Sequence, residues 1–373
     1  MDNNIFDNDY KNTSENLFDG PEWNPSSNGG GGHSRGFEDI AVREAKRSFS
    51  RFGLALFVYL LAANAIIILA AIILPLIFPD KYEAIGESYL YVFGMNSFAL
   101  YIFAFPILYL IVKGLPSAKR EKKKMKFKEF IATFAVAQLF MYVGNYIGIM
   151  INSTLGAILG HEIKNQTSEI IEDAPIWAVA IMVVILAPIF EELIFRKLLI
   201  DKLSRFGDKT VIITSAVSFG LFHGNLYQFF YAAALGALLA YVYVKTGKVI
   251  YPILMHAAVN FFGSVAVFPV LDAQEIILSF AEGTFKPETA LEMRQFINAM
   301  IIMSSYSIIQ LTLVGIGVYA LVSALRAKMI KAERLPEIRL PRHRISSAVM
   351  GNVGAILFIV FSVFTMIASL FVV

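Results

Sequence analysis

Two adjacent carboxylates and an arginine stand out because they directly follow an apolar run. The run, residues 176–190, is typical of a membrane-spanning helix, and Glu191, Glu192 and Arg196 come next. A charge near hydrocarbon costs about 2.5–3.5 kcal/mol, so a chain that keeps such groups there usually uses them. On a helix Glu192 and Arg196 share a face, whereas Glu191 points about 100° away. The spacing predicts an ion pair and a separate carboxylate for chemistry, or alternatively a salt-bridged helix end at the membrane surface.

Two further polar pairs lie in apolar segments downstream. Phe219 and His223 are four residues apart, as are His256 and Asn260, so each pair is expected to share a helix face. Taken singly, such a His or Asn can serve only to hydrogen-bond neighbouring helices. Short connections make these segments antiparallel neighbours, however. The sequence therefore predicts that all these groups converge in one cavity.

The residue types in that cavity fit hydrolysis of an amide bond. A Glu shielded from water beside an imidazole can share a proton with it and activate a water molecule near neutral pH. A tetrahedral intermediate needs donors aimed at its oxyanion, and a His and an Asn amide supply two. We therefore expect attack of water on a peptide carbonyl, with Arg196 holding the second Glu in place.

Composition places the chain in the membrane. Of its 373 residues 57% are hydrophobic and 16% charged, which is more apolar surface than a soluble protein of this size can bury. The expected fold is all-α and polytopic, with the active site in a central helix bundle. The sequence contains no cysteine, which excludes disulfides, a thiol nucleophile and thiolate metal ligands. Lipids are expected partners, and nucleic acid is not.

Apolar runs predict eight or nine membrane spans. They are residues 54–78, 89–112, 130–159, 176–200, 211–224, 229–244, 249–271, 297–325 and 345–373. The fifth is short for a full crossing, which leaves both counts open. The densest basic cluster, residues 113–128, is expected on the cytoplasmic side by the positive-inside rule. The protein is then a multi-pass protein of the cell membrane with its N-terminus in the cytoplasm.

In this order and spacing, the polar motifs resemble those of the CPBP family, also called Abi, of CAAX prenyl endopeptidases and bacteriocin-processing intramembrane proteases. The matching motifs are Glu-Glu-Leu-Ile-Phe-Arg at 191–196, Phe-Gly-Leu-Phe-His at 219–223 and His-Ala-Ala-Val-Asn at 256–260. The resemblance covers roughly residues 175–270. It implies an endopeptidase with its site inside the bilayer, near the cytoplasmic face.

The resemblance also implies a role for each motif residue. The expected roles are water activation by Glu191 and His223, support by Glu192 and Arg196, oxyanion stabilisation by His256 and Asn260, and lining of the substrate pocket by Phe219. The family has been described both as metalloproteases and as glutamate-type proteases. Glu191, His223 and His256 are of the types that bind a catalytic zinc. Because no His-Glu-x-x-His spacing occurs, we expect no obligatory metal.

The sequence divides into five expected parts. They are a disordered cytoplasmic tail (1–37), a basic amphipathic juxtamembrane segment (38–53), N-terminal transmembrane helices (54–174), a catalytic CPBP-like core (175–271), and an outer loop with C-terminal transmembrane helices (272–373). The tail lacks the pattern of a signal peptide, so the first span is expected to direct insertion.

Other functions and several substrates stay open at this point. The protein is alternatively a non-catalytic scaffold or maturation partner of another membrane protein. A proton-coupled transporter is a further alternative, although it predicts polar groups spread through the bilayer and paired repeats. For a protease, the family implies a prenylated CAAX tail or an unprenylated peptide, with a membrane-associated cleavage site that can be C-terminal.

Overall fold

The computed structural model describes residues 31–373 except 87, 166–167, 169–173, 331–335 and 372–373. Every regular element in these residues is a helix. The chain divides into two compact units, Met1–Ile40 and Ala41–Val373, and the candidate site lies in the second. Residues 1–30 of the expected tail are outside the described part. Residues 31–37 already belong to the first helix, since no proline separates them from the first span.

Seven helical stretches of the described residues are long and apolar enough to cross a membrane. They are Gly36–Ile77, Tyr89–Val112, Phe127–Leu159, Ile176–Phe206, Leu226–Thr246, Ile250–Ala281 and Ala290–Arg326. Two helices bent by 63°, Arg342–Val349 and Val353–Ser369, supply an eighth when they are counted as one span. The prediction of an all-α, multi-pass membrane protein is confirmed.

The short fifth span expected from the sequence, residues 211–224, is not among these helices. Residues 211–224 fall mostly in α11 (Asp208–Phe222), which has 15 residues. At 1.5 Å per residue this helix is about 22 Å long, against about 30 Å of bilayer hydrocarbon. Where eight or nine spans were expected, the described residues thus supply seven or eight.

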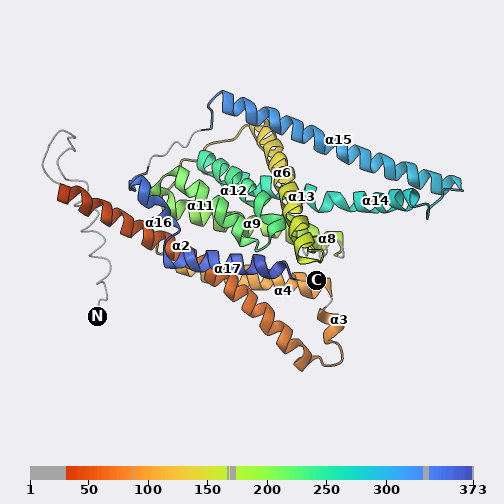
Figure 1. The fold of residues 1–373 in the computed structure, drawn as a ribbon, viewed down its shortest axis with the longest axis horizontal. Coiled ribbons are helices and arrows are strands. Elements are labelled where there is room, and N and C mark those ends of the chain that lie inside the picture. Colours follow the sequence, from red (N-terminus) through yellow and green to blue (C-terminus); the bar gives the residue numbers. More distant parts are fainter. Residues whose placement is uncertain (1–30, 87, 166–167, 169–173, 331–335, 372–373) are drawn as a thin grey trace. The chain divides into compact units, whose positions relative to one another are not determined.

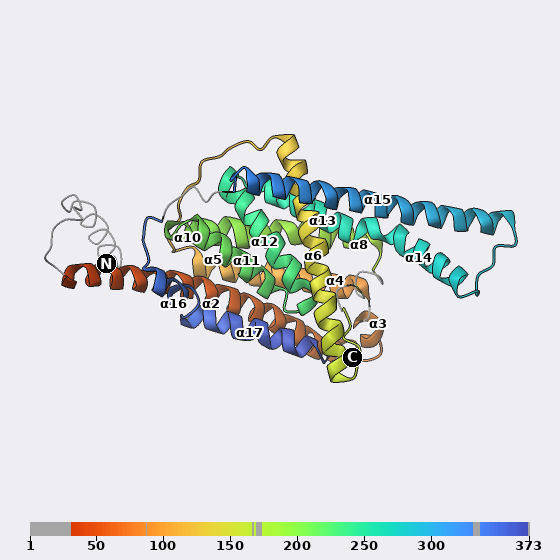
Figure 2. The same cartoon turned by 45° about the horizontal axis from the view of Figure 1, so that its top comes forward.

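Figures 1 and 2 label the individual helices that make up these stretches. Before α11, the described chain contains α2 (Gly31–Ile77), α3 (Tyr82–Gly86), α4 (Tyr89–Ser97), α5 (Phe105–Val112), α6 (Phe127–Leu159), α8 (Ile176–Val179), α9 (Ala187–Glu192) and α10 (Leu199–Leu203). The C-terminal half contains α12 (Leu226–Thr246), α13 (Ile250–Gly263), α14 (Phe268–Ala281), α15 (Ala290–Arg326), α16 (Ile345–Val349) and α17 (Val353–Ser369). Three π-helical segments are η1 (Phe98–Ala104), η2 (Ala180–Leu186) and η3 (Leu193–Leu198), and three 3₁₀ turns are η4 (Ser204–Phe206), η5 (Val265–Val267) and η6 (Arg342–Arg344).

The basic segment 38–53 is not a separate helix, because α2 continues through it without a break. Its apolar residues Val42, Ala45, Phe49 and Phe52 recur every three or four positions and are buried. This stripe packs into the protein core, so the amphipathic juxtamembrane segment expected from the sequence is the first part of the helix that continues into the first span.

Glycines bring α17 directly against α2, and the two helices run side by side in both views (Figures 1 and 2). A Cβ atom at Gly53 would meet the backbone of α17, and one at Gly354 would meet the carbonyl of Ser50. The Gly354 N–H donates to Ser50 Oγ at 3.0 Å. Small residues allow such close approach between membrane helices.

The helices that carry the polar motifs are neighbours, as the short connections predicted. α12 packs against α6, α11 and α13, and α13 packs against α9. The turn from α11 to α12 passes through Gly224, whose φ of 64° suits glycine. Asn225 then caps α12 by accepting a hydrogen bond from the Gln228 N–H at 2.9 Å. This turn fixes the position of the end of α11, where His223 lies.

Candidate active site

The second carboxylate of the pair is fully buried. Glu192 Oε2 lies 2.8 Å from Arg196 Nε, and both side chains are 0% exposed. The Arg196 guanidinium also donates to Ser215 Oγ at 3.3 Å and lies over the Phe219 ring, 4.6 Å from its centroid. The i,i+4 pairing expected from the sequence is therefore present. Breaking such a buried pair leaves an uncompensated charge, so these groups hold one another in place.

His256 lies between the two carboxylates. Its Nδ1 is 3.0 Å from Glu192 Oε1, and its Nε2 is 3.9 Å from Glu191 Oε2. Because an ionised carboxylate only accepts hydrogen bonds, the Nδ1–H donates to Glu192. The buried pair thus orients this imidazole, whose second nitrogen is directed toward Glu191.

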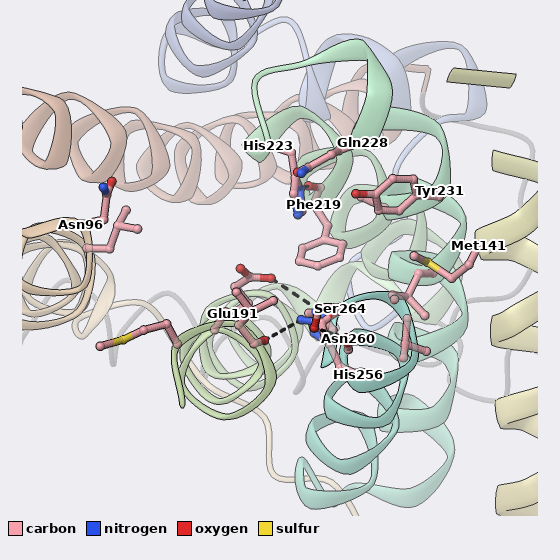
Figure 3. Close-up of a pocket in the computed structure, with 18 of the residues that line it drawn as sticks. Asn96, Met141, Glu191, Phe219, His223, Gln228, Tyr231, His256, Asn260 and Ser264 are labelled. Carbon is pink, nitrogen blue, oxygen red and sulfur yellow. Dashed lines mark hydrogen bonds and ion pairs between the residues drawn. The ribbon is translucent and has the colours of Figure 1, made fainter. Parts of the chain in front are cut away.

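Glu191 faces a cavity of about 520 Å³ (Figure 3). Of the seven residues expected in the site, five line this cavity: Glu191, Phe219, His223, His256 and Asn260. The other two, Glu192 and Arg196, lie behind its wall. The Glu191 side chain is 16% exposed, whereas that of Glu192 is 0% exposed. Neighbouring carboxylates on one helix therefore meet different surroundings.

His223 is the C-cap of α11 and presents one free ring nitrogen. Its Nδ1 lies 2.8 Å from the Phe219 carbonyl oxygen. Since a carbonyl only accepts, Nδ1 carries the hydrogen, and Nε2 of the neutral ring is an acceptor. The ring meets Phe219 edge-on, with centroids 5.0 Å apart. Glu191 and His223 both line the cavity, although the described residues include no ion pair between them.

Asn260 links α13 to the helix that leads to the Glu pair. Its side-chain Nδ2 donates to the Val183 carbonyl oxygen at 2.8 Å. Val183 belongs to η2, and π-helical turns shift the regular backbone pairing and often occur at functional sites. An amide nitrogen has two hydrogens, so one donor remains after this bond.

The cavity wall also includes residues that were not anticipated from the sequence, among them Tyr101, Gln228 and Tyr231. Gln228 and Tyr231 are three residues apart on α12, so they share a face of that helix. This spacing, just after the His223 turn, is a signal that could have found them. Tyr101 comes from η1 on a distant span and stacks on Phe190 with ring centroids 4.4 Å apart. No local pattern connects it with the motifs.

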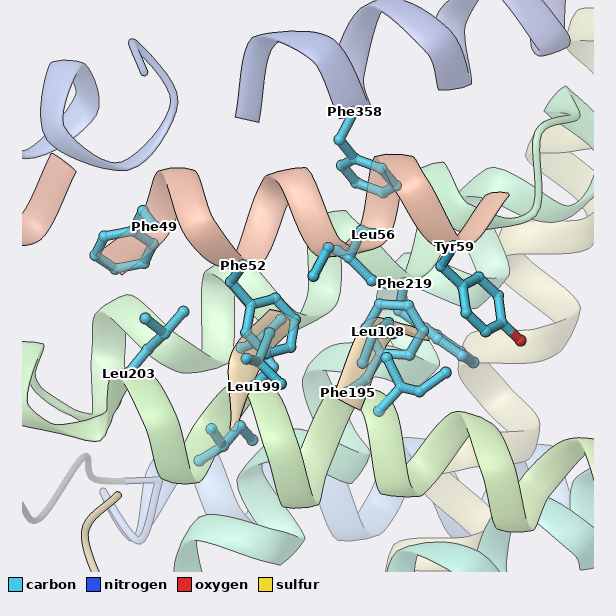
Figure 4. Close-up of a cluster of buried hydrophobic side chains, with 14 of the residues drawn as sticks. Phe49, Phe52, Leu56, Tyr59, Leu108, Phe195, Leu199, Leu203, Phe219 and Phe358 are labelled. Atoms are coloured by element: carbon cyan, nitrogen blue, oxygen red, sulfur yellow. The ribbon is translucent and has the colours of Figure 1, made fainter. Parts of the chain in front are cut away.

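A cluster of buried hydrophobic side chains packs against the Glu-bearing span, Ile176–Phe206 (Figure 4). Phe195 and Leu199, which are 0% exposed, follow the Glu pair in the chain and belong to this cluster. Phe195 also packs edge-on against Phe219, with centroids 5.2 Å apart. The rigid cluster fixes the span and thereby the direction of both carboxylates.

The described residues contain no cluster of side chains placed to bind a metal ion. They include no group of three or more His, Cys, Asp or Glu side chains placed to hold an ion, and Glu191, His223 and His256 do not form one. Whether the protein needs a metal stays untested, as does the expectation from the sequence that none is obligatory.

Comparisons with known proteins agree with the motifs. Residues 173–262 match the family model described as type II CAAX prenyl endopeptidase Rce1-like. The chain is 28% identical to membrane peptidase YdiL of Bacillus subtilis (strain 168) over 208 residues, which cover 52% of this chain and 81% of that protein. It is 30% identical to human CAAX prenyl protease 2 over 109 residues, 24% of this chain and 33% of the human protein. No solved structure matches the chain significantly.

The matched region contains all three motifs and the five motif residues that line the cavity. The resemblance noted in the sequence is thus confirmed, and it supports a membrane endopeptidase in general terms. Residues 173–262 identify this chain as similar to the type II CAAX prenyl endopeptidase Rce1-like family.

Proposed function

We propose that this protein hydrolyses a peptide bond inside the membrane, with the water activated by Glu191 and His223. The observation that supports this most strongly is that two adjacent carboxylates have different surroundings. Glu192 is locked by Arg196 and His256, whereas Glu191 faces a cavity that also contains two imidazoles. A carboxylate and an imidazole facing one cavity are the groups that general acid–base catalysis requires.

In the proposed reaction, a water molecule occupies the cavity between Glu191 and His223. Its oxygen attacks the peptide carbonyl carbon while one of its protons passes to Glu191. The same proton is then delivered to the nitrogen of the leaving amine as the carbon–nitrogen bond breaks. His223 orients the water by accepting its other hydrogen at Nε2. The products are a carboxylic acid and an amine.

His256 and Asn260 are proposed to stabilise the oxyanion that forms in this step. When Nε2 of His256 carries a proton, it donates from a ring whose orientation is fixed by Glu192. Asn260 contributes the hydrogen that is not bonded to Val183. Preorganised donors of this kind act strongly in a site shielded from water. Glu192 and Arg196, which do not line the cavity, are positioning residues in this account.

We further propose that the substrate is a membrane-associated peptide segment near the cytoplasmic face, and that the N-terminus is cytoplasmic. Support comes from the basic loop 113–128, because loops rich in Lys and Arg stay on the cytoplasmic side. This loop is joined to the Glu-bearing span, since Lys202 Nζ donates to the carbonyl oxygens of Lys113 and Leu115 at 3.1 and 2.7 Å. The name of the human relative adds a prenylated tail as one substrate class to test.

The test is cleavage of quenched-fluorescence peptide libraries, prenylated and unprenylated, by the purified full-length protein. Glu191→Ala and His223→Ala are compared with Glu275→Ala, which removes an exposed carboxylate outside the cavity. Each protein is assayed with and without a chelator. Glu191→Ala and His223→Ala are expected to lose cleavage, and Glu275→Ala is expected to keep it. No cleavage by any folded protein would instead favour a scaffold, and chelator-sensitive activity restored by zinc would make the protein a metalloenzyme.

A further inference from the structure

A second cavity, of about 500 Å³, lies between α2, α11, α16 and α17, outside the candidate active site. We call it the α11–α17 groove. Its inner side is made of buried residues such as Phe52 and Phe358, which are 2% and 3% exposed. Its outer edge includes Ile213, Val217 and Met350, which are 61%, 41% and 49% exposed. In a membrane-embedded chain, this apolar groove is open to lipid.

Two cations line the groove, Lys209 near the start of α11 and Arg342 in η6. Neither forms an ion pair in the part of the chain that the structure describes. Asp208, beside Lys209, is already paired with Arg120 at 3.0 Å. The neighbouring cation Arg205 is paired with Glu44 at 2.5 Å. The groove therefore has positive charge that no described carboxylate neutralises.

Backbone contacts join the segment before Arg342 to the residues just before α11. The N–H groups of Glu337 and Ile338 donate to the Arg205 carbonyl oxygen at 2.9 and 3.1 Å. Pro336 packs against Gly207, where an added Cβ atom would lie 3.2 Å from the proline ring. The segment that leads to Arg342 is thereby held beside the start of α11, where Lys209 lies.

The groove's length and charge distribution match one lipid molecule. Its α11 wall runs from Lys209 to Leu221, about 18 Å at 1.5 Å per residue. This is close to the hydrocarbon of one leaflet, half of about 30 Å. We infer that the groove binds an anionic phospholipid of the bilayer, with an acyl chain along the apolar wall and the phosphate at Lys209 and Arg342.

The inference is tested with the full-length protein in phosphatidylcholine nanodiscs with and without phosphatidylglycerol. Native mass spectrometry after release into detergent measures which lipid stays bound. The wild type is expected to retain phosphatidylglycerol preferentially. The variant Lys209→Gln/Arg342→Gln is expected to lose up to about five-fold in this preference for each cation removed. Lys122→Gln/Lys124→Gln removes the same charge from an exposed loop outside the groove, and it is expected to behave as the wild type.

A second variant separates the groove from general surface charge. Ile213→Trp keeps both cations but fills the apolar wall, so it is expected to retain less phosphatidylglycerol as well. Cleavage and thermal unfolding in detergent verify that each variant is folded. Equal retention of both lipids by the wild type would overturn the inference. So would equal losses in the Lys209/Arg342 and Lys122/Lys124 variants.

Discussion

The active-site cavity and the α11–α17 groove have nearly the same size, about 520 and 500 Å³, and they share the helix α11. α11 directs Phe219 and His223 to the cavity, and Ile213 and Val217 to the groove. The difference lies in the placement of charge. Titratable groups line the interior of the cavity, whereas the cations of the groove are confined to one end. Cavity volume therefore does not distinguish the two sites, but charge placement does.

The cavity and the groove also differ in the contacts that their charged groups make. His256 in the cavity wall is bonded to Glu192, which is paired with Arg196, which in turn bonds Ser215. Burying such groups is costly unless each has a partner. Long cationic side chains at the end of a membrane groove need no such partners, since they extend to the polar interface. A network of buried partners thus marks the site where chemistry is expected.

The largest effect is expected for removing one of the two groups that activate the water in the cavity. His223→Gln deletes the free Nε2 acceptor and is expected to lower kcat/KM by about 10²–10⁴-fold, the usual contribution of general acid–base groups. The melting temperature is expected to stay near that of the wild type, because the Phe219 carbonyl can still pair with the amide. Peptide cleavage and thermal unfolding check both. A rate close to that of the wild type would remove His223 from the mechanism.

Breaking the buried network is expected to affect stability as well as activity. Arg196→Met leaves the buried Glu192 charge without its guanidinium partner, and breaking a buried ion pair costs about 3–5 kcal/mol in comparable cases. The double variant Glu192→Leu/Arg196→Met removes both charges and is expected to recover much of this stability while activity stays low, since His256 then lacks its partner. Thermal unfolding measures the effect on stability, and peptide cleavage measures the effect on activity. Unchanged melting of the single variant would contradict the account.

Removing one oxyanion donor is expected to have an intermediate effect. Asn260→Ala is expected to lower kcat by about 10²–10³-fold with a smaller change in KM, because the donor acts mainly in the transition state. Steady-state kinetics with one library-derived peptide separates the two constants. A rise in KM at unchanged kcat would limit Asn260 to binding substrate or to joining α13 with η2.

The smallest effect is expected on the groove side of α11. Ile213→Ser changes an exposed groove residue and is expected to alter kcat/KM in detergent by no more than about two-fold, as for surface substitutions in general. Its activity is measured beside that of the cavity variants. A large loss of cleavage here would show that the two faces of α11 do not work independently.

Spacing along single helices was the most informative part of the sequence. Because residues four apart share a helix face, both the Glu192–Arg196 pair and the Phe219–His223 contact could be predicted from their positions in the chain. Composition alone was enough for the polytopic helical fold. The catalytic roles of these residues stay predictions, since geometry does not report turnover.

Contacts between distant helices could not be predicted. Spacing indicates which way His256 points from its own helix, but not that it lies between Glu191 and Glu192, 64 and more positions earlier. Tyr101 also lines the cavity, and no sequence pattern near it predicts this position. Residues 211–224 were counted as a potential span because hydrophobicity does not reveal that α11 is a short helix packed along α12. Such contacts depend on packing between helices, which no local pattern encodes.

The most direct measurement is the rate of peptide cleavage by Glu191→Gln. Glutamine keeps the shape of the side chain but cannot take the proton from water, and the Glu192–Arg196 pair that positions the helix remains intact. The account predicts a loss of about 10²–10⁴-fold in kcat/KM, with an unchanged melting temperature and with phosphatidylglycerol still bound in the groove. Cleavage by the folded variant at a rate near that of the wild type would contradict the proposal that Glu191 activates the water.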